Sequence, residues 1–131
     1  MKVVADTNVL VRAVVRDDQN QAAAAVALLR EASAIIVPMP CLCEFVWVLK
    51  RVYKFDNAAI AAAIRSLVSA DNVRVETELC EPALTVLEAG GDFADGAIAA
   101  EGTALGGETF VSFDKRAVNL VGRAGISARL L

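Results

Sequence analysis

Short apolar runs alternate with longer helical segments along the whole chain, and this alternation constrains the fold more than any other feature. Short apolar runs are typical of buried strands, whereas the longer segments have the length and spacing of helices. Strands separated by helices favour a parallel sheet with helices on its faces. We therefore predict an α/β fold with a central, mainly parallel sheet. The expected strands are 2–6, 34–37, 73–76, 109–112 and an edge strand at 126–130.

Helices are expected between these strands. Thr7 or Asn8 starts the first, and Asp56 is the expected N-cap of the fourth, because Asp accepts hydrogen bonds from free backbone N–H groups. Pro38 and Pro40 close the second strand, and Gly90-Gly91 ends the fifth helix. The expected helices are 8–16, 19–32, 41–54, 57–69, about 81–89, about 93–104 and 115–121.

The length and composition indicate one domain over residues 1–131. With 131 residues, 56% of them hydrophobic, the chain is long enough to bury its own core. No apolar stretch reaches the roughly 18 residues of a membrane span, and Asp6 interrupts the N-terminal run too early for a signal peptide. Cys41, Cys43 and Cys80 have neither disulfide nor zinc spacing. We expect a soluble cytoplasmic protein with free thiols.

The chain contains no histidine. This excludes Ser-His-Asp and Cys-His hydrolases, zinc sites with histidine ligands, and ribonucleases that use imidazole as acid and base. An enzyme of this composition that hydrolyses phosphodiesters would need a metal ion to activate the water.

Carboxylates occur where strands end and helices begin. Asp6 follows the first expected strand, and Asp114 follows the fourth. Glu44 lies near the start of an apolar helix, and Asp95 opens another, one turn after Asp92. The carboxyl ends of parallel strands and the starts of the following helices meet in one crevice, where these negative charges would repel each other. Magnesium or manganese suits such an all-oxygen set, so we predict a metal site.

Each acid also has a simpler interpretation. Asp6, Asp92 and Asp114 could each only cap a helix. Glu44 is harder to explain in this way, because the segment from Cys41 to Leu49 is apolar on every side and an unpaired buried Glu is costly. A metal site accounts for all of these acids with one cause.

The net charge of −3 does not argue against a nucleic-acid substrate. Without the five candidate acids, 11 of the 16 acidic residues remain against 13 basic ones, a balance of +2. Several basic residues share a helix face with a candidate site residue or directly follow one, so they are candidate contacts to an RNA backbone, with ordinary solvated surface as the alternative. These residues are Arg12, Arg16, Arg51, Lys115 and Arg116.

The ordered set of motifs resembles the PIN-domain nucleases over nearly the whole chain, and the compact length resembles their VapC-type toxin branch. The motifs are the opening Val-Val-Ala-Asp6-Thr-Asn8, Glu44 in an apolar helix, Asp92-Phe-Ala-Asp95-Gly-Ala-Ile-Ala-Ala, and Phe-Val-Ser112-Phe-Asp114.

This resemblance implies a single PIN-like domain, an α/β/α sandwich that cleaves RNA with magnesium or manganese. It also implies a homodimer and inhibition by a small cognate antitoxin. Gly96 replaces the usual alanine, which we expect to loosen the helix start by at most about 1 kcal/mol. The family's acidic quartet corresponds to Asp6, Glu44, Asp95 and Asp114, with Asp92 as an additional metal ligand and Asn8 and Ser112 as supporting polar residues.

Two alternative functions stay open. One is a magnesium-dependent phosphatase or phosphotransferase with an aspartyl nucleophile, although Asn8 stands where such enzymes need a second Asp. The other is an inactive PIN-like module that binds RNA or a partner protein.

Three apolar segments predict assembly. Residues 22–29 and 58–64 are apolar on more than one stripe, which favours a homodimer over a monomer that buries both segments itself. Residues 44–55 carry large apolar side chains around most of a helix, which predicts either burial within the domain or a groove for an antitoxin segment.

Overall fold

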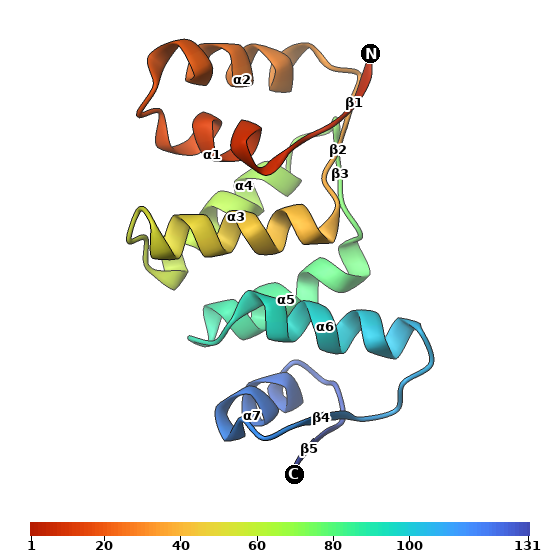
Figure 1. Cartoon of the computed structure of the whole chain (residues 1–131). Coiled ribbons are helices and arrows are strands. Elements are labelled where there is room, and N and C mark those ends of the chain that lie inside the picture. Colours follow the sequence, from red (N-terminus) through yellow and green to blue (C-terminus); the bar gives the residue numbers. More distant parts are fainter. The chain divides into compact units, whose positions relative to one another are not determined.

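Two groups of parallel strands organise the chain, and the predicted α/β class is confirmed. The computed structural model describes all of residues 1–131, which form two units, Met1–Val75 and Glu76–Leu131 (Figure 1). No helix combines the length and hydrophobicity needed to span a bilayer.

The first unit contains a three-stranded parallel sheet in the order β1-β2-β3. Its strands are β1 (Lys2–Val4), β2 (Ala34–Ile36) and β3 (Val73–Arg74). Val3 lies opposite Ile35, which in turn lies opposite Val73. Ile35 on the central strand is fully buried, as expected for a strand with neighbours on both sides.

Four helices complete the first unit, and Figure 1 shows α1 and α2 side by side. Asp56 caps α4 through the backbone N–H of Ala59 at 2.8 Å, as predicted. The third helix begins at Met39, two residues earlier than predicted, because Pro38 is its N-cap and Pro40 lies in the first turn, where a missing N–H is tolerated. The bounds are α1 (Thr7–Val15), α2 (Gln19–Glu31), α3 (Met39–Arg51) and α4 (Asn57–Val68).

The second unit carries the remaining elements, with β4 and β5 paired in parallel. The predicted edge strand is therefore confirmed. The fifth helix begins at Thr77, one turn earlier than predicted, and Pro82 lies inside it. Burial of Leu79 and Cys80 holds the added turn in place. The bounds are α5 (Thr77–Glu88), α6 (Phe93–Ala104), β4 (Phe110–Ser112), α7 (Lys115–Arg123) and β5 (Ala128–Leu130).

Helices α5 and α6 pack closely at Gly96. A Cβ atom at this position would lie 2.7 Å from the Ala83 Cα atom and 3.1 Å from the Pro82 carbonyl oxygen. Only glycine permits this approach without a shift of the backbone. Helix propensity alone therefore did not show that Gly96 is needed for the packing of α5 against α6. This packing fixes the first turn of α6, which carries Asp95.

Candidate metal centre

Asp6 lies two residues beyond the end of β1 and is the N-cap of α1. Its Oδ1 atom accepts a hydrogen bond from the Thr7 backbone N–H at 2.8 Å, and its side chain is exposed. Thr7 is buried, and its hydroxyl donates to the Cys41 Sγ atom of α3 at 3.6 Å. The Cys41 thiol in turn donates to the Ala5 carbonyl oxygen at 3.5 Å. These contacts fasten the end of β1 to the start of α3.

The prediction that Glu44 is buried among apolar residues is wrong, because its side chain is exposed. The buried side of α3 carries Leu42, Phe45, Val46 and Leu49, which follow the i, i+3, i+4, i+7 spacing of a single helix face. Burial therefore gives no support to Glu44 as a metal ligand. Its support comes from its position on α3.

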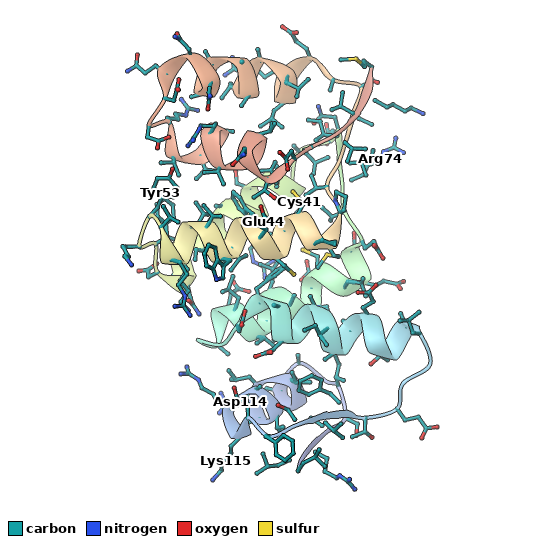
Figure 2. All side chains as sticks on the ribbon, in the orientation of Figure 1. Cys41, Glu44, Tyr53, Arg74, Asp114 and Lys115 are labelled. Carbon is teal, nitrogen blue, oxygen red and sulfur yellow. The ribbon has the colours of Figure 1, made fainter.

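Glu44 lies one turn beyond Cys41, and Figure 2 shows both residues on α3. Burial raises the pKa of the Cys41 thiol, while the hydrogen bond from Thr7 opposes this rise. The negative charges of Asp6 and Glu44 raise the same pKa further. Both carboxylates are thus electrostatic neighbours of Cys41. Sequence reasoning missed Thr7 and Cys41, although each stands within three residues of a predicted ligand.

In the second unit, two aspartates begin helices and a third lies in a first turn. Asp92 caps α6 through the backbone N–H of Ala94 at 3.0 Å. Asp114 caps α7, and its Oδ1 atom accepts from the backbone N–H groups of Arg116 at 2.9 Å and Ala117 at 3.1 Å. The Ser112 hydroxyl oxygen accepts from the Asp114 backbone N–H at 3.0 Å, so Ser112 holds the turn that carries this acid.

Asp95 lies half-buried in the first turn of α6. Partial burial raises the pKa of its carboxyl group, and the negative charges of Asp92 and Asp114 raise it further. The second unit therefore brings Asp92 and Asp114 close enough to Asp95 for their negative charges to repel its carboxylate. A divalent cation would relieve this repulsion, and the all-oxygen donor set fits magnesium or manganese.

The capping alternative is confirmed for Asp6, Asp92 and Asp114, and it is compatible with metal binding. Each cap uses Oδ1, while the Oδ2 atom of each accepts no hydrogen bond from the protein. In neither unit do three acidic or cysteine side chains converge as a preformed metal site.

Three of the five predicted RNA-contacting residues are engaged within the protein. Arg12 donates to Gln21 at 2.7 Å, to Asp17 at 2.9 Å and to Tyr53 at 3.1 Å. Arg16 donates to the Ala13 carbonyl oxygen, and Arg116 donates to the Gly90 carbonyl oxygen at 2.8 Å. The two that remain exposed without such contacts are Arg51 and Lys115.

Asn8 lies in the first turn of α1 and is exposed. It lines a groove between α1 and α2 rather than contacting Asp6 through a hydrogen bond. The other lining residues are Val9, Arg12, Gln21, Ala24, Ala25 and Leu28.

In a comparison with known protein families, residues 3–122 of the chain match the PIN domain. The chain belongs to the PIN-domain family. The match covers all five candidate acids, together with Asn8 and Ser112. PIN domains are generally nucleases that use divalent metal ions such as magnesium, and they act on nucleic acid. No curated protein matches the chain.

Proposed function

We propose that this PIN domain is an endoribonuclease that hydrolyses RNA phosphodiesters with magnesium or manganese. The observation that carries the proposal is the PIN-domain match over residues 3–122, which includes all five candidate acids, and the closeness of Asp92 and Asp114 to Asp95 fits a divalent cation. The proposed domain spans residues 1–131. Its proposed metal ligands are Asp6, Glu44, Asp92, Asp95 and Asp114.

The bound metal would polarise the scissile phosphate and lower the pKa of a water molecule that attacks it. In this proposal, Asp6 and Asp95 hold the metal, while Glu44 and Asp114 complete the coordination and orient the water. In-line attack then leaves a 5′-phosphate and a 3′-hydroxyl group. The chain itself supplies no imidazole for acid–base catalysis.

The direct test is RNA cleavage by the purified protein with magnesium, with manganese and with EDTA. Cleavage should require the metal, and Asp6→Asn or Asp95→Asn should lower its rate by orders of magnitude. Asp71→Asn is the matched control, because Asp71 is exposed in the turn between α4 and β3. Full cleavage in EDTA, or a fully active Asp95→Asn protein, would refute the proposal.

The same samples separate the two alternative functions. Transfer of labelled phosphate from a substrate to the protein would indicate a phosphotransferase with an aspartyl nucleophile. RNA binding without cleavage at any metal concentration would indicate an inactive binding module.

We further propose a VapC-type toxin that acts in the cytoplasm and is silenced by a small antitoxin. Its support is the order of the motifs and the compact length of the chain. Phe45, Val46 and Leu49 are buried within the first unit, so α3 offers less free apolar surface to an antitoxin than the sequence predicted. Expression of the lone protein should arrest growth, and co-expression of a small protein encoded beside it should relieve the arrest. Normal growth with intact cellular RNA would refute the toxin role.

A homodimer is the proposed assembly. Helix α2 exposes Ala23, Ala24 and Ala27, and α4 exposes Ala58 and Ala62. Small side chains let helices from two copies approach closely. Light scattering should give twice the monomer mass at micromolar concentration, and a monomeric mass would refute this assembly.

A further inference from the structure

Two aromatic side chains are exposed, and each lies beside a candidate metal ligand. The chain has five Phe, one Trp and one Tyr. Trp47 is 58% exposed and Phe113 is 83% exposed, whereas the other aromatic residues are buried or half-buried. Single exposed apolar residues are common on protein surfaces. The position of these two, rather than their exposure alone, therefore carries the argument.

Trp47 shares one face of α3 with an acid and a cation. Glu44 precedes it by three residues, and Arg51 follows it by four, a spacing that places all three on one side of the helix. The three side chains are exposed, and the buried residues of α3 occupy the opposite side. Arg51 has no ion-pair partner.

Phe113 has the same kinds of neighbour in the second unit. It directly precedes Asp114, and Lys115 follows as the first residue of α7. Figure 2 shows Asp114 and Lys115 together at the start of this helix. The hydrogen bond between Ser112 and the Asp114 backbone at 3.0 Å holds the turn on which Phe113 stands. Each unit thus presents an acid, an exposed aromatic ring and an exposed cation within a short distance along the chain.

These three kinds of group match the three parts of a nucleotide chain. The metal held by the acid would take the scissile phosphate, the aromatic ring offers a stacking surface to a nucleobase, and the cation attracts the next phosphate. We propose that Trp47 and Phe113 are specificity-determining residues that stack against unpaired nucleobases of the RNA substrate. Bases within a duplex are already stacked on their neighbours, so their faces are not free for these rings. This inference rests on the proposed ribonuclease function and assigns two residues to substrate binding.

Trp47 is the single tryptophan of the chain, so tryptophan fluorescence reports on this position alone. The experiment uses the full-length Asp95→Asn protein with magnesium, which keeps the RNA intact during titration. An unpaired oligonucleotide should quench the fluorescence in a saturable manner, and an RNA hairpin with a fully paired stem of equal length should bind more weakly. Emission of the free protein should be that of a water-exposed indole.

Substitution tests both rings in the same background. Trp47→Ala and Phe113→Ala should each weaken binding of a labelled single strand roughly tenfold, measured by anisotropy. Trp47→Phe should keep most of the affinity, because it retains a ring. Val52→Ala and Leu105→Ala are matched controls, since these residues are 57% and 83% exposed and should leave affinity unchanged.

Several results would overturn the inference. These are unchanged affinity in both ring-deleted variants, equal affinity for duplex and single strand, or emission showing that Trp47 is buried in the free protein. A change in oligomeric mass on Trp47→Ala without a change in RNA affinity would assign the ring to a protein interface instead. If the rings bind single strands but the wild type cleaves no RNA, the proposed function fails while the stacking assignment stands.

Discussion

Gly96→Ala should destabilise the protein, although helix propensity alone predicts the reverse. Alanine is favoured over glycine in a helix by about 1 kcal/mol. The added Cβ, however, would lie 2.7 Å from the Ala83 Cα atom, well inside the roughly 3.5–4.0 Å of a normal carbon contact. Backbone atoms cannot rotate away, so α5 and α6 must separate, and such overpacking costs about 1–3 kcal/mol. After subtraction of the gain in helix propensity, the expected net loss is up to about 2 kcal/mol, or up to about 8 °C in Tm.

Gly102→Ala is the matched control, because Gly102 lies in the same helix and a Cβ atom added there would have no atom within 4 Å. This substitution should raise stability by up to about 1 kcal/mol. Thermal and urea unfolding followed by circular dichroism would measure both variants. If Gly96→Ala is as stable as Gly102→Ala, the close approach of α5 and α6 does not limit the helix, and the reasoning is refuted.

The remaining predictions concern charge and metal. Without metal, Asp95→Asn should raise Tm at neutral pH by the equivalent of about 1 kcal/mol or less, since solvent screens a half-buried group. Burial and the neighbouring acids raise the pKa of Asp95, so the stability that its proton contributes is lost as pH rises from the ordinary carboxyl value of 3.8 through the raised pKa. In calorimetric scans below this pH range, the Tm of Asp95→Asn should therefore no longer exceed that of the wild type. Magnesium should raise the Tm of the wild type but not that of Asp95→Asn, and equal shifts would contradict a site at Asp95. Arg12→Ala should lower Tm but leave RNA affinity unchanged, because the Arg12 side chain donates its hydrogen bonds to Gln21, Asp17 and Tyr53. A loss of affinity would show instead that Arg12 contacts the RNA. The hydrogen bond from Tyr53 and then the charge of Arg12 lower the pKa of Asp17. The folding stability that the charged Asp17 carboxylate gains from these contacts should therefore persist above pH 3.8 and disappear as pH falls through the lowered pKa.

Local signals in the sequence predicted most elements and several caps. Asp56 at the start of α4 and the Asp6-Thr7 junction follow from the short-range preference of Asp for free N–H groups. The start of α5 was missed because Pro82 disfavours a preceding helical turn, whereas burial of Leu79 holds that turn. Local preference alone could not decide between these opposing effects.

Features that depend on contacts distant in sequence were beyond sequence reasoning. The hydrogen bond between Arg12 and Tyr53 joins residues 41 positions apart, so helical spacing alone could not show that the protein itself engages this candidate RNA contact. The exposure of Glu44 was missed for a different reason. Its helix is apolar in composition, and only the packing of α3 shows which side faces the core.

The helix caps described above imply that the candidate acids would be lost at different rates during the evolution of a PIN domain that no longer needed catalysis. Asp6, Asp92 and Asp114 would still be retained, since replacing an N-cap aspartate by alanine costs about 1 kcal/mol of folding stability. Glu44 and Asp95 cap no helix, and Asp95 repels its neighbours when metal is absent. Selection on folding alone would let these two positions drift first. If these acids hold the metal as proposed, changes at Glu44 and Asp95 are therefore the first ones expected in a PIN domain that has lost nuclease activity.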